Sequence, residues 1–547
     1  MSKILKYFLF SIACITIGLL VGFKIKDSIP RGTAISLDSG ARKLQRALSF
    51  IENNYVEEPN YNDLVDEAMH GMMNALDPHS TYIPASEMDL IQEDLEGAYE
   101  GIGIQFGIIE DTLYVEHPIP GGPSAELGIM PGDRIIAVDG ENIAGIGISN
   151  ADVTRYLKGP EGTQVQVNVL RRGVADILPF TIMRGKIPNH SVEYSYMVND
   201  TTGYIFVTRF AETTYREFRG HLEQLLERGM TNLVLDLRGN GGGYMTMANK
   251  ISDEFLSTGK LIVSTEGRLP SSDQRYKATS SIGSFENGGL VILIDYGSAS
   301  ASEIVSGAVQ DHDRGLIVGV RSFGKGLVQY QEEFADGSAM RLVFSKYYTP
   351  SGRCIQKPYN KTREEYQDEI NERFASGEIY DADKVNLPDS LKFKTMAGRT
   401  VYGGGGIYPD VFVPNDTTGA SQYFMDLRLK DLPRQFAFQY VDDHPELAAS
   451  YASARKFREE YTIDNVILTE FQDFAVAHGV AKKAAQFAHS RDRIALQLKA
   501  LIGRRIYNND GYYPILNAAD PVFKAGLELL PVSRNLQRSG EVDLSLR

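Results

Sequence analysis

The sequence predicts a multidomain α/β protein, and three patterns point to this. Residues 189–415 alternate apolar strand-like runs with amphipathic stretches, which is typical of a mixed sheet with helices packed around it. Residues 97–185 carry short strands separated by glycine turns, whereas residues 35–95 and 416–547 repeat apolar residues at helical spacing. A chain of 547 residues also exceeds one ordinary core, so we expect several domains.

Composition excludes several classes of protein. With 43% hydrophobic and 23% charged residues, the chain is not disordered throughout. Its 56 basic and 71 acidic residues give a net charge of −15, which argues against a nucleic-acid partner. The two cysteines, Cys14 and Cys354, do not make a disulfide framework, and we expect no bond between them. The chain has no CxxC or HExxH motif, so we expect no metal and no cofactor.

The N-terminal residues 1–26 predict a signal anchor or transmembrane segment. Lys3 and Lys6 precede an apolar stretch from Tyr7 to Phe23, roughly long enough to span a bilayer. A cleaved secretory signal is the alternative, but no small-x-small cleavage site follows Gly22. We therefore expect a membrane-anchored or exported protein of the cell envelope, with its bulk in the periplasm.

A strand, a small-residue turn and a helix form the centre of the sequence. The apolar run 290–294 predicts a buried strand, residues 297–302 are all Gly, Ser or Ala, and 303–309 can continue as a helix. The first N–H groups of a helix have no partner inside it, so they can hold an oxyanion beside a serine hydroxyl. Ser300 is thus a candidate nucleophile. Alternatively, Ser300 and Glu303 form a capping box.

Lys325 favours the nucleophile over the cap. A serine needs a base, and a lysine can serve if desolvation lowers its pKa. Lys325 follows a second apolar run, 316–320, and has only Gly, Phe and Leu near it, with no acid for five residues on either side. A solvated surface lysine is the alternative. Together, the two residues predict a Ser-Lys dyad.

Two other motifs overlap this region. Residues 319–325 match the first seven positions of a phosphate-binding P-loop, but Gly326 stands where the metal-binding Ser or Thr belongs, and β-type sequence follows. His312 lies between two aspartates and could join a Ser-His-Asp triad, but no G-x-S-x-G elbow is present. We expect His312 to be an exposed turn residue.

These motifs carry a family resemblance. The run SASASE, then Gln310-Asp311, then FGKG-x-VQ, resembles the carboxy-terminal processing (tail-specific) serine proteases. The resemblance implies that Ser300 is the nucleophile, Lys325 the base 25 positions later and Gln329 the residue that orients the lysine. Asp311 matches an aspartate associated with the site, for which a structural role is the alternative. The likeness also implies a crotonase/Clp-like ββα core.

A second glycine-rich loop predicts the oxyanion hole. The buried strand 233–237 ends in the loop 238–243, RGNGGG, before another helix. By resemblance, this loop supplies one oxyanion-hole amide, from Gly242 or Gly243, and Ala301 supplies the other. A purely structural turn is the alternative.

Residues 97–185 resemble a PDZ domain. The turn Gly101, Ile102, Gly103 and Ile104 stands at the carboxylate-binding loop, and MPGD and VDG follow in the expected order. Consecutive N–H groups at such a turn hold a terminal carboxylate, and the adjacent strand edge accepts a peptide. We therefore expect protein substrates with apolar C-terminal tails as partners. A glycine turn without a ligand is the alternative.

The remaining segments carry no chemical motif. In residues 35–95, Asp77-Pro78 breaks the helical pattern, and His79 is expected in the turn; LDPHSTYI is typical of the segment before the PDZ domain in the family. The charged residues 354–400 are expected to be a surface excursion. Residues 416–547 could serve in substrate gating, oligomerisation or docking, and the sequence does not decide among these roles. The oligomeric state is not predicted.

These observations predict a serine endopeptidase that recognises C-terminal tails through its PDZ domain. The competing hypothesis is a catalytically inactive PDZ-type peptide-binding scaffold of the cell envelope, and a P-loop ATPase is the third.

Overall fold

The computed structural model describes residues 31–359, 363–385 and 389–539. The chain divides into two compact units, Met1–Pro84 and Ala85–Arg547, and we describe each by itself. The anchor predicted at residues 1–26 lies outside the described residues. Among the helices that the structure describes, none is both long and apolar enough to cross a membrane.

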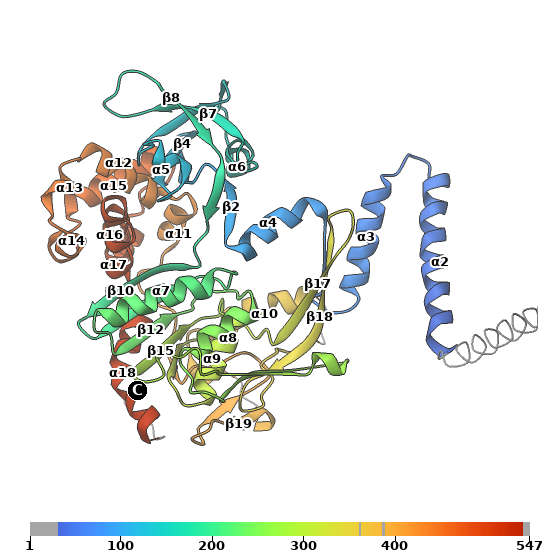
Figure 1. Cartoon of the computed structure of the whole chain (residues 1–547). Helices are drawn as coiled ribbons and strands as arrows, with labels where there is room; N and C mark the ends of the chain where they lie inside the picture. Colours follow the sequence, from blue (N-terminus) through green and yellow to red (C-terminus); the bar gives the residue numbers. More distant parts are fainter. Residues whose placement is uncertain (1–30, 360–362, 386–388, 540–547) are drawn as a thin grey trace, which may run out of the picture. The chain divides into compact units, whose positions relative to one another are not determined.

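The described part of the first unit contains two helices and a short strand, α2 (Arg31–Asn54), α3 (Tyr61–Asn74) and β1 (Thr81–Ile83) (Figure 1). The side chain of Asn60 caps α3 by accepting a hydrogen bond from Asn62 N. The chain then turns at Asp77, whose carboxylate accepts hydrogen bonds from His79 N at 2.8 Å and Ser80 N at 2.7 Å. This turn confirms the predicted helix break and contains His79, as expected.

The second unit begins with a small β domain. Helix α4 (Ala85–Glu96) leads to β2 (Ala98–Gly101), which pairs with β9 (Gly185–Pro188) where the chain enters and leaves the domain. Its main sheet has the order β3-β4-β5-β7-β8. The remaining elements are β3 (Ile104–Ile109), β4 (Thr112–Pro118), α5 (Pro123–Glu126), β5 (Arg134–Val138), β6 (Glu141–Asn142), α6 (Asn150–Leu157), β7 (Gln164–Leu170) and β8 (Leu178–Met183). Within the described residues, β3 pairs with β4 alone, so no strand pairs with its other edge.

A six-stranded sheet forms the centre of the second unit. Its order is β10-β11-β12-β15-β16-β21, and all pairs except β10–β11 are parallel. The strands are β10 (Val192–Asn199), β11 (Thr202–Val207), β12 (Asn232–Asp236), β15 (Gly289–Ile294), β16 (Leu316–Gly319) and β21 (Val411–Phe412). The helices that follow β11, β12 and β15 are α7 (Thr214–Glu227), α8 (Met245–Asp253) and α9 (Ala301–Asp311).

Successive side chains of β15 point to opposite faces of the sheet, and both faces are covered. Leu290 and Ile292 point into the core shared with α7, α8 and α9. Val291 and Leu293 point into a second core, which Phe523 completes from α18 (Pro521–Ser539). The predicted mixed sheet with helices around it is thereby confirmed.

A second sheet and an insertion complete the region of the predicted protease. Strands β17 (Leu327–Glu333), β18 (Ala339–Tyr348), β13 (Leu261–Gly267) and β14 (Gln274–Lys277) pair in that order, all antiparallel. The insertion contains α10 (Arg363–Ser376), β19 (Lys392–Lys394) and β20 (Thr400–Tyr402). The prediction of a surface excursion for residues 354–400 is wrong in part, because Tyr366 and Arg373 of α10 are buried. Arg373 pairs with Glu369 at 2.7 Å, whereas the other acidic residues of α10 are exposed.

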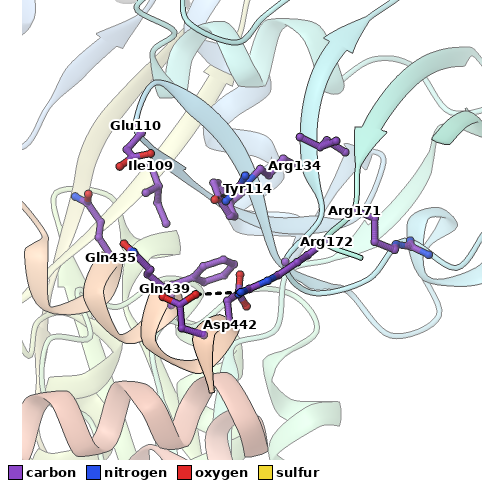
Figure 2. A pocket seen from close by; sticks show the side chains of 13 residues that line it. Ile109, Glu110, Tyr114, Arg134, Arg171, Arg172, Gln435, Gln439 and Asp442 are labelled. Atoms are coloured by element: carbon purple, nitrogen blue, oxygen red, sulfur yellow. Dashed lines mark hydrogen bonds and ion pairs between the residues drawn. The ribbon is translucent and has the colours of Figure 1, made fainter. Parts of the chain in front are cut away.

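The C-terminal helices have a core of their own and also contact the small β domain. They are α11 (Gln422–Leu429), α12 (Leu432–Asp443), α13 (Leu447–Ser450), α14 (Ala454–Glu460), α15 (Asn465–Ala477), α16 (Ala484–Tyr507) and α17 (Tyr513–Ala519). Tyr114 meets Phe438 edge to face at 4.9 Å, and Arg172 pairs with Asp443 at 3.1 Å. Figure 2 shows the polar cavity of about 400 Å³ beside these contacts. None of the predicted site residues lines this cavity.

Candidate functional site

Ser300 lies in a strained turn between β15 and α9. It is the residue before the helix, with φ 55° and ψ −112°, and its side chain is half-buried. A positive φ is uncommon outside glycine and costs free energy, so it persists only where neighbours fix it. Ser300 N donates to the Glu303 carboxylate at 2.8 Å, which is the Glu303 half of the predicted capping box.

Glu303 connects this turn to the loop that carries the lysine. The carboxylate is fully buried and accepts hydrogen bonds from Ser322 Oγ at 2.5 Å, Gly324 N at 2.7 Å and Lys325 N at 2.9 Å, besides the one from Ser300. Burial raises the pKa of Glu303, and the four donors oppose that rise. The sequence predicted only a cap here, because the partners from 322–325 are distant along the chain.

A buried tyrosine makes a second connection between the two segments. Tyr347 Oη lies 3.0 Å from Ser300 O and 2.9 Å from Lys325 O, and its hydroxyl proton is the donor for either carbonyl. Together with Glu303, this residue fixes the backbone of both predicted catalytic residues. No hydrogen bond joins Ser300 Oγ to Lys325 Nζ in the described part of the chain, and such catalytic contacts are often long before substrate binds.

Lys325 has the surroundings of a lysine that loses its charge easily. Its Nζ donates to Gln329 Oε1 at 2.9 Å, and no carboxylate among the described residues forms an ion pair with it. Burial lowers the pKa of Lys325, repulsion from Arg341 lowers it further, and attraction to Glu303 opposes both. Arg341 stands opposite Gln331 in the β17–β18 register and donates to Gln331 Oε1 at 2.8 Å.

The glycine loop after β12 packs directly on the Ser300 turn. Gly242 has φ 102°, and a Cβ there would lie 2.7 Å from Ser300 Cβ and 3.0 Å from Ala301 N. Gly242 N already donates to Asn240 Oδ1 at 2.9 Å. By contrast, neither Gly243 N nor Ala301 N donates a hydrogen bond to any residue that the structure describes. These two amides remain the candidate donors for an oxyanion.

Asp311 and His312 lie at the far end of α9. The 11 residues of this helix separate Asp311 from Ser300 by roughly 16 Å. Asp311 is buried, pairs with Arg353 at 2.8 Å and accepts a hydrogen bond from Ser351 N at 3.0 Å. The prediction that His312 is exposed is wrong, because it is half-buried with Nε2 2.7 Å from Leu261 O. Neither side chain is brought to Ser300.

The segment after Lys325 bears on the nucleotide-binding hypothesis. A P-loop lysine stands where a helix begins, whereas here β17 starts at Leu327. The predicted β-type continuation is confirmed, and the P-loop interpretation has no support in this geometry.

The predicted carboxylate turn lies between β2 and β3. Ile102 O accepts hydrogen bonds from Ser124 N at 3.1 Å and Ser124 Oγ at 2.6 Å, and Gly103 O accepts one from Ile119 N at 2.9 Å. With these carbonyls held inward, the N–H groups of Ile102 and Gly103 donate to no group among the described residues. The two residues directly precede β3 in the chain, where the predicted peptide strand would pair.

Family models match four parts of the chain. The model described as peptidase family S41 matches residues 201–362, and a PDZ domain model matches 114–171. The model of the activating protease CtpB N-terminal domain matches 26–87, and a family of unknown function matches 423–508. The first two confirm the predicted family and the PDZ domain.

Two curated relatives extend the match. A carboxy-terminal-processing protease of Bartonella bacilliformis is 36% identical over 311 residues, 56% of this chain and 70% of that protein. The carboxy-terminal processing protease CtpA of Bacillus subtilis is 34% identical over 326 residues, 58% of this chain and 67% of that protein. This chain is a member of the carboxy-terminal processing protease family.

Solved structures similar to this chain include a whole processing protease and an isolated PDZ domain. A photosystem II D1 C-terminal processing protease is 23% identical, covers 68% of this chain and 93% of its own, and has a TM-score of 0.35. The PDZ domain of a carboxy-terminal protease from Vibrio cholerae in complex with peptide is 35% identical, covers 16% and 97%, and has a TM-score of 0.15. Because both TM-scores are low, we draw no conclusion from these structures about the arrangement of the domains.

The charge of Arg341 should set the pH dependence of the protease. If Lys325 is the predicted base, the rate should rise with pH as this lysine loses its proton. Arg341→Gln removes a repulsion, so the pKa of Lys325 should rise and the ascending limb of kcat/KM should move to higher pH. Lys346→Gln, which removes a charge from the same strand, is the control. If the ascending limb of kcat/KM stays at the same pH in Arg341→Gln, Arg341 does not lower the pKa of Lys325.

The close packing of Gly242 on Ser300 predicts a sharp difference between neighbouring glycines. Gly242→Ala should lower kcat by about 10²-fold or more, since the methyl group displaces the nucleophile turn and the Ala301 amide. Gly241→Ala has open space around its Cβ and should retain near-normal kcat. Steady-state kinetics, with melting temperatures of both variants, test this. Equal kcat values for the two variants would rule it out.

Proposed function

We propose that this protease is a serine endopeptidase that binds the C-terminal tail of protein substrates through its PDZ domain and cleaves with a Ser300–Lys325 dyad. The observation that carries the proposal is the buried Glu303 carboxylate. It binds the backbone of both residues, while the Lys325 amine itself contacts Gln329 and no described carboxylate. A lysine in that environment loses its proton more readily than one in water.

The reaction then needs only groups of this chain. Neutral Lys325 takes the proton of Ser300, and Ser300 Oγ attacks the peptide carbonyl. The tetrahedral oxyanion accepts hydrogen bonds from Ala301 N and Gly243 N, because Gly242 N is already bonded to Asn240. Removing one such donor costs about 10²–10³-fold in turnover. Lys325 returns the proton to the leaving amine, and water hydrolyses the acyl-enzyme.

Capture of the substrate uses the small β domain. The N–H groups of Ile102 and Gly103 hold the terminal carboxylate, and the open edge of β3 pairs with the last residues of the tail. Val153 and Leu157 of α6 share a core with Ile102, so the helix flanks this turn and offers an apolar wall for the tail's side chains.

The last residue of α9 is proposed to have a structural role. Asp311 and Arg353 are both fully buried and pair with each other, so the ion pair anchors the chain after β18 on α9. This agrees with the structural alternative for Asp311 rather than with a catalytic role.

Sequence features support a location in the cell envelope. The apolar stretch from Tyr7 to Phe23 follows two lysines and is long enough to anchor the protease in a membrane. We place the catalytic domain outside the cytoplasm on this basis.

Removing either member of the dyad should abolish cleavage without affecting capture of the tail. Ser300→Ala and Lys325→Ala should each leave a tailed peptide intact in mass spectrometry, yet bind it with the affinity of the unchanged protein. Full cleavage by Lys325→Ala would refute the dyad. An intact, bound peptide with the unchanged protein would instead favour the inactive scaffold.

The carboxylate turn predicts dependence on a free C-terminus. Titrated against the Ser300→Ala protein, a peptide with an amidated C-terminus should bind about 10- to 100-fold more weakly than the same peptide with a free carboxylate. This is the loss expected for charged hydrogen bonds of about 1.5–3 kcal/mol. Equal affinities would exclude Ile102 and Gly103 as carboxylate donors.

A further inference from the structure

The loop that carries Lys325 has no regular secondary structure of its own. Buried backbone groups need partners, so residues 322–326 depend on contacts from elsewhere. On one side these come from Glu303 and Tyr347, as described above. On the other side they come from the insertion that follows Gln356, which the sequence placed at the surface.

Arg373 of α10 contributes the central contacts of the insertion. Its side chain is 3% exposed, and it donates to Ser322 O at 2.8 Å and to Phe323 O at 3.1 Å. These are the carbonyls two and three residues before Lys325. The planar guanidinium carries several donors in fixed geometry, so one arginine can hold two adjacent carbonyls.

A half-buried carboxylate on the same helix holds Arg373 in place. Glu369 pairs with Arg373 at 2.7 Å, with Lys357 at 3.0 Å and with Arg321 at 3.4 Å. Burial alone would raise the pKa of Glu369, but these three cations bring it below its usual value. Glu369 is therefore ionised near neutral pH, and it fixes three cations around the loop.

Lys357 closes the same side of the loop. Its N–H donates to Gly324 O at 2.9 Å, and its Nζ lies 4.1 Å from the ring centroid of Phe323 and 4.2 Å from that of Tyr366. Gly324 has φ 91°, and a Cβ there would lie 3.2 Å from Lys357 Cβ. The insertion and the loop are therefore in close contact at Gly324.

We propose that α10 positions the catalytic lysine of this protease, with Arg373 as a positioning residue that acts through the carbonyls of Ser322 and Phe323 and Glu369 as the residue that holds Arg373. This inference rests on the proposed role of Lys325 as the base. It assigns a function to a segment that bears no motif.

The decisive measurement is the pH profile of kcat and KM for a tailed peptide, with the full chain. Arg373→Gln should lower kcat by about 10- to 100-fold with little change in KM, since a misplacement of about 1 Å can cost 10²-fold. The ascending limb of the pH profile of Arg373→Gln should move to higher pH. The reason is that a loosened loop admits water to Lys325, which raises the pKa of this lysine. The charged groups that act on this lysine, Glu303 and Arg341, are unchanged. Arg373→Lys keeps the charge and should restore part of kcat.

Arg314→Gln is the matched control. Arg314 is also a buried arginine that donates to three carbonyls, those of Phe255, Gly288 and Phe285, but it lies after the far end of α9. Its loss should lower the melting temperature and leave the pH profile unmoved. If Arg373→Gln behaves like Arg314→Gln, the role of Arg373 is only structural and the inference is overturned.

Two further variants keep the outcome decisive. If Arg373→Gln does not fold, Glu369→Gln loosens the same contacts with a smaller change in volume, and a normal kcat and pH profile in that variant would overturn the inference. Lys325→Ala separates this inference from the proposed function. Cleavage by Lys325→Ala would refute the proposal that Lys325 is the base. If Lys325→Ala is inactive while Arg373→Gln has a normal kcat and pH profile, only the proposed role of α10 is refuted.

Discussion

One buried carboxylate organises the candidate active site. Glu303 is enclosed by protein and takes four hydrogen bonds, from the nucleophile turn and from the loop of the lysine. Donors of this kind stabilise a buried charge, and losing one would leave the remainder poorly compensated. The carboxylate therefore holds two segments in one geometry although more than 20 residues separate them. The strained φ of Ser300 is a consequence of being fixed in this way.

The motifs with local spacing were predictable from the sequence. Ser300 and Lys325 stand beside strand–turn signals, whereas the role of Gln329 was implied only by the family resemblance. The structure places Gln329 Oε1 2.9 Å from Lys325 Nζ. The choice between Gly242 and Gly243 was not predictable, because it depends on which amide the Asn240 side chain occupies. The influence of Arg341 was equally hidden, since it requires the register of β17 on β18.

The insertion shows why charge patterns mislead. Glu369 and Arg373 have the i, i+4 spacing that usually marks a solvated helix face, and the helix that carries them is rich in acids and bases. Nothing local indicates that the lysine loop lies against that face and leaves its carbonyls to be paired. The error of the surface prediction therefore comes from a tertiary contact. His312 is the same kind of case, because its acidic neighbours suggested solvent while Leu261 O holds its ring.

Two charges of opposite sign act on the Lys325 amine, the Glu303 carboxylate and the Arg341 guanidinium. Glu303 binds the backbone N–H of Lys325 rather than its Nζ, so its charge opposes loss of the proton without forming an ion pair that would hold it. Glu369 is ionised nearby, but Arg373, Lys357 and Arg321 neutralise it. The Lys325 amine itself donates a hydrogen bond to the Gln329 side chain and is repelled by Arg341. The carboxylates thus bind the loop backbone and other cations, and among the described residues none pairs with the Lys325 amine. Such surroundings suit the role of base that we propose for this lysine.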